Sequence, residues 1–497
     1  MLKLKTINNL LHIPTWMAVV LIAIIVLRIP SLFEPYSYGD EMIYLTLGEA
    51  IRRGLVLYKE IHDNKPPLLY DLAAISGNLF WFRAILGMWM LVTTIAFWRL
   101  VQRLFPKNLN LVKISVIAFA ILTTLPLLEG NIANAELFMI GPTIIGFLFL
   151  LKEKPSNLDL VLGGVCFSLA TLFKVPAAFD FPVVFAYWIL VSKLTPKEFV
   201  KRFAITTLSF LGLIVISFVW FWYRGASGEY AMAAFLQNVG YLSSWRPDDA
   251  QKSFLVKNGP LLMRGVIVLI GFTLTFIFRK KLGKGFILAT IWLLFSLFAV
   301  TLSERPYPHY LIQSVPSIAI LIGLLIYSRK MDQIWAIIPL VLVAFVPVYY
   351  KFYYYDSVSY YSRFVSFATG AITKKQYFDQ FDGNVNRNYA LAEFINSSSQ
   401  PQDSVFVWGD SPPIYALSNR LPNIKYVANY HIHDFSSNEE VLSQLSSNMP
   451  DFVIILPEGG SFRQLTSFVS QNYLPVYKTF GATVWHRSVA QILSGKY

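Results

Sequence analysis

Residues 15–33 read TWMAVVLIAIIVLRIPSLF and form the first long apolar run of the chain. About 20 mainly apolar residues are needed to cross the roughly 30 Å hydrocarbon core of a bilayer, so this run is long enough to span it. Lys3 and Lys5 precede the run as they would in a signal peptide, but no small-residue cleavage motif follows it. We therefore expect a first span that the chain retains.

Comparable apolar runs recur as far as about Tyr350. The 497 residues are 55% hydrophobic and only 14% charged, and the mean hydropathy is +0.51. This composition excludes an ordinary soluble globular protein and predicts an all-α polytopic membrane protein. The expected spans number about eleven and cover residues 15–33, 79–98, 114–128, 135–151, 159–174, 176–192, 203–223, 260–278, 285–302, 310–327 and 334–350.

The formal charge of +13 comes from basic residues at the ends of the apolar runs, not from one aromatic-interleaved patch. This distribution argues against a nucleic-acid partner and indicates membrane topology. If the N-terminus is cytoplasmic, the connectors 128–134 and 303–309 lie outside, and they are nearly devoid of Lys and Arg, as the positive-inside bias requires. The cytoplasmic connectors each carry at least two Lys or Arg and are 99–113, 152–154, 193–202, 279–284 and 329–330.

Three longer segments then fall outside the cytoplasm: residues 34–78, residues 224–259 and the tail from about Lys351 to Tyr497. The tail is more polar and has short β-like runs at 405–408 and 452–456, which predict a small extracytoplasmic α/β domain. The predicted domains are therefore a membrane domain, residues 1–350, and a tail domain, residues 351–497. In the middle loop, Tyr241, Trp245 and Arg246 are further candidates for a binding role, but no motif places them.

Cys166 is the single cysteine, so neither a disulfide nor a cysteine-based metal site can form within one chain.

Residues 38–52, YGDEMIYLTLGEAIR, predict a helix that rests on the membrane surface. Asp40 stands at its N-terminus, where the helix dipole favours an ionised carboxylate. Such a carboxylate can accept the proton of an attacking hydroxyl or amine, or it can simply cap the helix. The expected apolar stripe is Ile43, Leu47, Ala50 and Ile51, with Glu41, Gly48 and Arg52 opposite.

Residues 58–70, YKEIHDNKPPLLY, place two prolines directly after Lys65, where the chain returns to the bilayer. The stiff backbone holds this lysine near the headgroups, where its ammonium can neutralise a departing lipid phosphate. The alternative is an interfacial lysine that snorkels to the membrane surface.

The Asp40-Glu41 motif and the Lys65-Pro66-Pro67 segment about 25 residues later resemble those of GT-C glycosyltransferases. The similarity is greatest to the family-39 group of protein mannosyltransferases and lipid A aminoarabinose transferases. Further similar stretches are GNIANAELFM at 130–139, RPYPHY at 305–310, and FVWGD at 406–410 with Ile414, Tyr415 and Arg420.

This resemblance implies a GT-C membrane core and a polyprenyl-phosphate sugar as donor. It implies that Asp40 positions and deprotonates the acceptor, that Lys65 stabilises the leaving phosphate, and that the anomeric carbon is inverted. The sequence departs from the lipid A group at Asn64, where that group often has Glu.

Other polar residues stand at the outer ends of the predicted spans. Glu136 and Lys174 are costly in a membrane unless each has a partner or a task. Glu136 with Asp40 could hold a divalent cation, although two carboxylates are a weak metal signature; no other cofactor is required. The further donor-phosphate ligands expected are Lys174, Arg305 and His309, and the substrate ligands expected are Glu41, Tyr44, Tyr58, Asp63, Asn131, Asn134, Glu136, Tyr307 and Tyr310.

The function expected is transfer of a sugar from a polyprenyl-phosphate donor to an extracytoplasmic lipid, glycan or protein, in a multi-pass cell membrane protein. One alternative is a lipid-linked glycan polymerase or ligase, which generally relies on arginines in large outer loops. Another is a flippase for lipid-linked sugars, which would place charged residues near span midpoints.

Overall fold

The computed structural model of the protein describes residues 13–237, 253–328 and 331–488. Tyr241, Trp245 and Arg246, the candidates for a binding role in the middle loop, fall outside these residues. The chain divides into two compact units. The span unit comprises Met1–Leu32, Arg83–Leu213 and Leu242–Ser357, and the loop–tail unit comprises Phe33–Phe82, Ile214–Tyr241 and Val358–Tyr497. The predicted domain boundary at residue 350 stays a prediction.

Most of the described helices are apolar. Seven are long and apolar enough to cross a membrane: Thr15–Phe33, Leu79–Leu104, Pro196–Tyr223, Asn258–Phe278, Lys284–Thr301, Pro308–Tyr327 and Met331–Tyr349. Four shorter apolar helices are Leu109–Thr124, Ala135–Leu150, Asn157–Phe173 and Val175–Val191. Each predicted span overlaps one of these segments, and the polytopic all-α membrane fold is confirmed.

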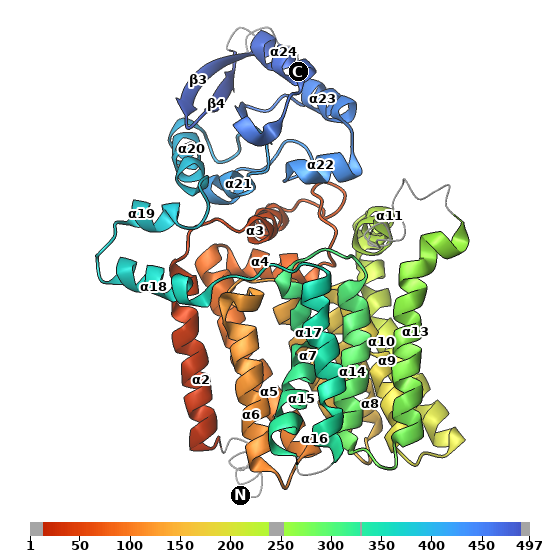
Figure 1. The fold of residues 1–497 in the computed structure, drawn as a ribbon. Coiled ribbons are helices and arrows are strands. Elements are labelled where there is room, and N and C mark those ends of the chain that lie inside the picture. The colour runs from red at the N-terminus through yellow and green to blue at the C-terminus, as the bar shows by residue number, and fades with distance from the viewer. Residues whose placement is uncertain (1–12, 238–252, 329–330, 489–497) are drawn as a thin grey trace, which may run out of the picture. The chain divides into compact units, whose positions relative to one another are not determined.

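The helices of the span unit run side by side (Figure 1). Helix α7 (Ala135–Leu150) packs on α8 (Asn157–Phe173), and α15 (Val315–Tyr327) packs on α6 (Leu109–Thr124) and α14 (Lys284–Thr301). The other helices carrying span-unit residues are α2 (Thr15–Arg28), α5 (Leu79–Leu104), α9 (Pro182–Val191), α10 (Pro196–Tyr223), α13 (Phe254–Phe278), α16 (Met331–Trp335) and α17 (Ile337–Tyr349). Short helical turns are η1 (Ile29–Phe33), η2 (Pro126–Leu128), η3 (Val175–Asp180) and η7 (Pro308–Ser314).

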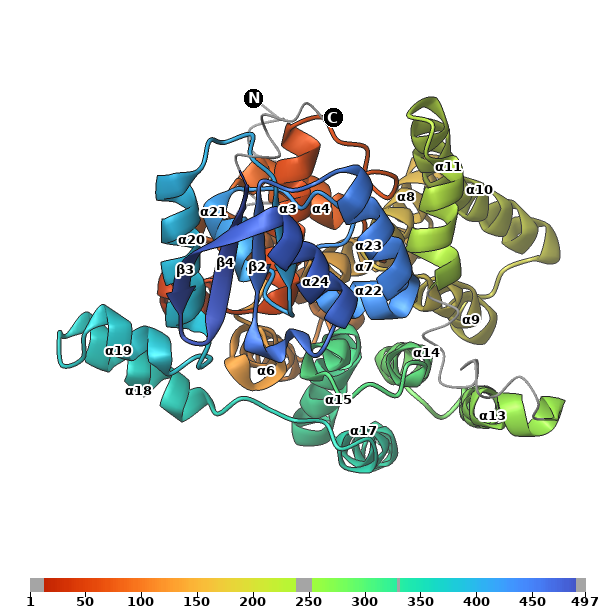
Figure 2. The same ribbon diagram turned by 90° about the horizontal axis from the view of Figure 1, so that it is seen from above.

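The tail of the loop–tail unit contains a four-stranded sheet in the order β1-β2-β4-β3. Strand β1 (Val405–Trp408) is parallel to β2 (Phe452–Ile455), whereas β4 (Ala482–Arg487) is antiparallel to both β2 and β3 (Tyr473–Thr479). Figure 2 shows β2, β4 and β3 side by side. The buried residues around this sheet include Phe406, Trp408, Val453, Leu465 and Val469. The small α/β domain predicted for the tail is therefore confirmed.

The remaining elements of the loop–tail unit are helices and short turns. They are α3 (Gly39–Arg52), α4 (Leu68–Ser76), α11 (Ser227–Tyr230), η4 (Ala231–Leu236), α18 (Ser357–Ala368, which begins at the unit boundary), α19 (Lys374–Asp379), α20 (Val385–Ser398), α21 (Pro413–Ser418), α22 (Asn429–Phe435), α23 (Asn438–Ser447), η8 (Pro457–Gly459) and α24 (Arg463–Asn472).

Helix α3 forms where it was predicted, but its polar face is not free. Of the three residues expected opposite the apolar stripe, Arg52 is exposed, whereas Glu41 and Gly48 are buried. At Gly48 the neighbour is α4, which packs across the side of α3 that carries this glycine. A Cβ at Gly48 would lie 2.6 Å from the backbone nitrogen of Ala74. Protein therefore covers part of the helix face that lies opposite the apolar stripe.

This close approach predicts that Gly48→Ala destabilises the protein. The added methyl group meets backbone atoms that cannot rotate aside, and such overpacking costs about 1–3 kcal/mol. Gly39→Ala, in the first turn of the same helix, has nothing within 4 Å of its Cβ and serves as the control. We expect a lower apparent melting temperature in detergent for the Gly48 variant only. Equal melting temperatures for the two variants would show that α3 and α4 can move apart without loss of folding free energy.

Candidate active site

The carboxylate of Asp40 lies in the first turn of α3 and is not a helix cap. The N-cap residue is Tyr38, which makes no side-chain cap hydrogen bond. One turn along the helix, the hydroxyl of Tyr44 donates to Asp40 Oδ2 at 2.8 Å. Burial and the charge of Asp40 raise the pKa of Tyr44 well above its usual value, so its hydroxyl remains a donor. Asp40 itself keeps 31% of its side chain exposed, which leaves it open to a reactant.

Lys65 lies against Asp40 in the loop–tail unit. Its Nζ is 3.5 Å from Asp40 Oδ2 and 3.8 Å from Asp63 Oδ2. The ammonium also lies 4.9 Å from the centroid of the Tyr44 ring, a cation–π contact. The Lys65 ammonium thus lies between the carboxylates of Asp40 and Asp63. Of these two carboxylates, Asp63 is fully buried and Asp40 is partly exposed.

The backbone of Lys65 is fixed by two tyrosines. The hydroxyl of Tyr58 donates to the carbonyl oxygen of Lys65 at 2.8 Å, and the Lys65 N–H donates to the hydroxyl of Tyr70 at 3.0 Å. Tyr58 has a φ of 72°, a left-handed conformation that costs a non-glycine residue of order 1–3 kcal/mol. Pro66 and Pro67 stiffen the following two positions. Tyr58, which was predicted to contact substrate, binds the lysine segment through its hydroxyl and packs its ring on Phe221 and Tyr230.

Asp63 is the most enclosed charge of this cluster, with 1% of the residue exposed. Tyr70 donates its hydroxyl to Oδ2 at 2.8 Å, the Asn64 N–H donates to Oδ1 at 2.7 Å, and His431 Nε2 lies 3.3 Å from Oδ1. Burial by itself raises the pKa of Asp63, but the charge of Lys65 and the hydrogen bond from His431 outweigh it and hold the pKa well below its usual range. Asp63 is therefore ionised.

Tyr70 and His431 were not among the residues predicted for the site. Tyr70 stands five residues after Lys65, within the segment already singled out, and its spacing was the available signal. His431 comes from α22 in the tail. No sequence motif connects it with Asp63, so only the fold reveals the contact.

His62 is a second buried histidine of this unit, packed against the rings of Tyr426, His431 and Phe435. Burial, aided by the neighbouring His431, lowers its pKa from 6.5 to about 4. Between pH 6.5 and 4, His62 binds a proton in the unfolded chain but not in the folded chain. The folded state therefore has its full stability above pH 6.5 and loses stability as the pH falls toward 4.

We predict that His62→Phe removes most of this acid sensitivity. The linkage amounts to about 3 kcal/mol at most, and phenylalanine retains the ring contacts without titrating. Apparent melting temperatures at pH 7 and pH 4.5 measure the difference. The control is His433→Phe, because His433 is exposed on the same helix as His431. An equal acid-induced loss in wild type and His62→Phe would refute the assignment.

Further predicted residues gather in the span unit. Glu136, at the start of α7, forms an ion pair with Lys174, whose Nζ lies 4.0 Å from the ring centroid of Tyr310. Glu136 and Lys174 were each expected to need a partner at the membrane edge, and each is a partner of the other. The His309 Nε2 atom lies 3.9 Å from Glu136 Oε1, which joins a predicted phosphate ligand to the same cluster.

Glu129 completes the span-unit cluster and was not predicted. It is fully buried, has a left-handed φ of 57°, and binds His309 Nδ1 through Oε2. Asn134 donates its side-chain amide to the same oxygen at 3.1 Å, and the Tyr353 hydroxyl lies 3.4 Å from Oε1. Burial and the charge of Glu129 raise the pKa of Tyr353, which keeps that hydroxyl protonated.

The last predicted residues lie near this cluster or have less defined surroundings. The Tyr307 ring stacks on that of His309 at 5.7 Å, whereas Asn131 is buried and Arg305 is partly exposed. Within the described residues, no group of three or more His, Cys, Asp or Glu side chains is arranged to hold a metal ion. The two predicted metal ligands, Asp40 and Glu136, belong to different units. The roles of all these residues stay predictions.

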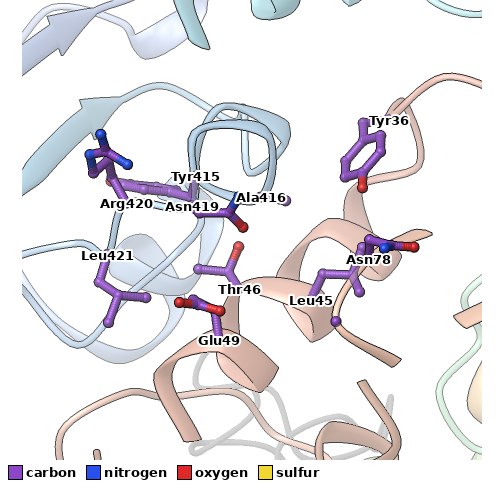
Figure 3. A pocket seen from close by; sticks show the side chains of 11 residues that line it. Tyr36, Leu45, Thr46, Glu49, Asn78, Tyr415, Ala416, Asn419, Arg420 and Leu421 are labelled. Atoms are coloured by element: carbon purple, nitrogen blue, oxygen red, sulfur yellow. The ribbon is translucent and has the colours of Figure 1, made fainter. Parts of the chain in front are cut away.

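A small open pocket lies where α3 meets the segment around α21. Figure 3 shows Thr46 and Glu49 of α3 on one side and Asn419 and Arg420 on the other. None of the predicted site residues lines it.

Comparison with known proteins identifies the fold. Neither a protein-family model nor a curated protein matches the sequence. Among solved structures, the chain is similar to ArnT from Cupriavidus metallidurans bound to undecaprenyl phosphate, with a TM-score of 0.58 and 13% identity over 95% of this chain and 97% of that chain. For ArnT in the apo state the TM-score is 0.55, with 13% identity over 96% and 98%. The likeness spans both compact units, and the chain has the GT-C fold that its first loop predicted.

Proposed function

We propose that the protein is an inverting glycosyltransferase that moves a sugar from a polyprenyl-phosphate donor to an extracytoplasmic acceptor. The observation that carries this proposal is the Asp40 carboxylate 3.5 Å from the Lys65 ammonium in a chain of GT-C fold. A base and a phosphate-binding cation are the two groups that such a displacement needs. The undecaprenyl phosphate bound to ArnT, a protein of the same fold, supports the class of donor.

In the proposed reaction, an acceptor hydroxyl or amine attacks the anomeric carbon of the donor. A new bond forms between the acceptor atom and this carbon while the bond from the carbon to the phosphate oxygen breaks. The acceptor proton passes to Asp40, and the electron pair of the broken bond leaves with the polyprenyl phosphate. Lys65 stabilises the charge gained by that phosphate. A single displacement of this kind inverts the anomeric configuration.

Tyr44 and Asp63 support these two groups. The hydrogen bond from Tyr44 fixes one oxygen of Asp40, which keeps the carboxylate oriented toward an acceptor. Asp63 holds Lys65 from the other side. Both carboxylates compete with the donor phosphate for the ammonium, and release of the phosphate therefore restores two ion pairs.

The span-unit cluster is proposed to bind the remainder of the donor or the acceptor. Lys174, Arg305 and His309 are proposed as phosphate ligands. Because Lys174 already pairs with Glu136, phosphate binding there requires an exchange of partners.

We propose the membrane orientation that the charge distribution predicts, with a cytoplasmic N-terminus and the tail outside the cytoplasm. The proposed substrate ligands are Glu41, Tyr58, Asn131, Asn134, Glu136, Tyr307 and Tyr310.

The experiment that tests the function is transfer by purified protein from a panel of membrane-extracted, radiolabelled polyprenyl-phosphate sugars. We expect release of polyprenyl phosphate and a product of inverted anomeric configuration, which NMR establishes. Parallel reactions with a chelator test for a divalent cation. Retention of configuration would contradict the single displacement, and label that moves equally well without the protein would contradict the activity.

A further inference from the structure

The tail contributes a side chain to the segment that carries Lys65. His431 Nε2 and Asp63 Oδ1 lie 3.3 Å apart, and each residue is 1% exposed. Lys65 approaches the other oxygen of the same carboxylate, with Nζ 3.8 Å from Oδ2. One buried carboxylate therefore joins a tail histidine to the lysine proposed to stabilise the leaving phosphate.

The surroundings of His431 fix the direction of its ring. Its ring centroid lies 4.2 Å from that of Tyr430 and 5.9 Å from that of Phe435. Its Nδ1 atom is buried and has no hydrogen-bond partner among the described residues. Nε2 is therefore the ring nitrogen placed to donate to Asp63, whereas Nδ1 faces no acceptor among the described residues.

The backbone beside this contact is also held by the tail. The His62 N–H donates to the carbonyl oxygen of Lys425 at 2.8 Å, and His62 and Tyr426 form an isolated parallel β-bridge. The residue immediately before Asp63 is thus anchored to the segment that leads into α22. These backbone contacts hold Asp63 at a fixed distance from His431.

We propose that His431 is a positioning residue for Lys65. Its Nε2–H donates to Oδ1 of Asp63 and so stabilises part of the buried negative charge. The Lys65 ammonium is then shared between Asp63 and Asp40. Without this donor, Asp63 draws more strongly on Lys65, and the ammonium is less available to the leaving phosphate. The effect on catalysis rests on the proposed function. The effect of His431 on Lys65 rests only on the contacts described above.

The kinetic test compares His431→Phe with His431→Gln, because phenylalanine keeps a ring without a donor and glutamine keeps an amide donor. We expect kcat to fall about 10-fold for the phenylalanine variant and less than about 3-fold for the glutamine variant, with the acceptor KM within about 2-fold of wild type in both. His433→Phe, on the exposed side of the same helix, is the matched control and should leave kcat unchanged.

A double-mutant cycle separates action through Asp63 from general damage. If His431 acts through this carboxylate, His431→Phe should change kcat by less than about 2-fold when Asp63 is already replaced by Asn. The same 10-fold loss in both backgrounds would overturn the proposal. If the phenylalanine variant does not fold, His431→Asn replaces it in the cycle, since its shorter amide cannot reach Asp63 in the same geometry.

A second measurement does not depend on activity. The acylation rate of the Lys65 amine is followed by peptide mass spectrometry at fixed pH, with exposed Lys59 as the internal reference. We expect His431→Phe to slow labelling of Lys65 at least about 3-fold, because a tighter ion pair with Asp63 makes the amine less available to the reagent. Unchanged labelling in folded protein would overturn the positioning role. If labelling slows but wild type transfers no sugar, the proposed function fails and the positioning role stands.

Discussion

Asp40→Asn is expected to lower the turnover of sugar transfer by about 10²- to 10⁴-fold, the usual contribution of a general base. Asparagine has nearly the same size, and its amide oxygen can still accept the Tyr44 hydroxyl, but it cannot take the acceptor proton. Donor affinity should be retained, because Lys65 loses one competing carboxylate and keeps its bond to Asp63.

The measurement is single-turnover transfer of radiolabelled sugar together with donor retention on the purified variant. Asp434→Asn makes the same chemical change at an exposed position in the tail and is the control. If Asp40→Asn transferred sugar as fast as wild type, Asp40 would not be the base and the proposed mechanism would be wrong. Loss of donor binding instead of turnover would assign Asp40 to binding.

Lys65→Met should lower turnover by about 10²- to 10³-fold, because removing one electrostatic contact to the developing charge costs of that order. Methionine keeps an unbranched chain without the ammonium. Asp63 would lose its nearest cation but keep Tyr70, the Asn64 N–H and His431 as partners, so the folded state should survive with reduced stability.

The kinetic constants decide what Lys65 does. A fall in kcat with little change in the donor KM indicates a contact formed mainly in the transition state, whereas a higher donor KM alone indicates uniform binding. Lys59→Met neutralises an exposed lysine of the same loop and should behave as wild type. Lys65→Arg keeps the charge and should restore part of the turnover.

Much of the fold could be predicted because the membrane imposes simple requirements. Long apolar runs have to cross the bilayer as helices, and Lys and Arg at their ends mark the boundaries. The strands β1 and β2 were visible as short apolar runs. Strands β3 and β4 were not: Leu474 and Val476 of β3 are exposed, and pairing with β4 depends on hydrogen bonds that leave little trace in the sequence.

The site was predictable where its parts are close in the sequence. Asp40 and Lys65 stand 25 residues apart in the same outer segment, 34–78, and belong to the motifs that carry the family resemblance. The approach of α4 to α3 was missed, although Gly48, which leaves room for Ala73 and Ala74, was the available signal. His431 was missed because it is far from Asp63 in the chain and a lone histidine has no distinguishing spacing.

The contact between Asp63 and His431 sets an order of events during synthesis. The ribosome adds the 367 residues that lie between them before the histidine exists. At about 5–20 residues per second, the loop that carries Lys65 waits for roughly 20 to 70 seconds with its buried carboxylate lacking that partner. The nascent loop can therefore reach its final packing only late, and a ribosome that stalls before α22 would leave the proposed catalytic lysine without its support.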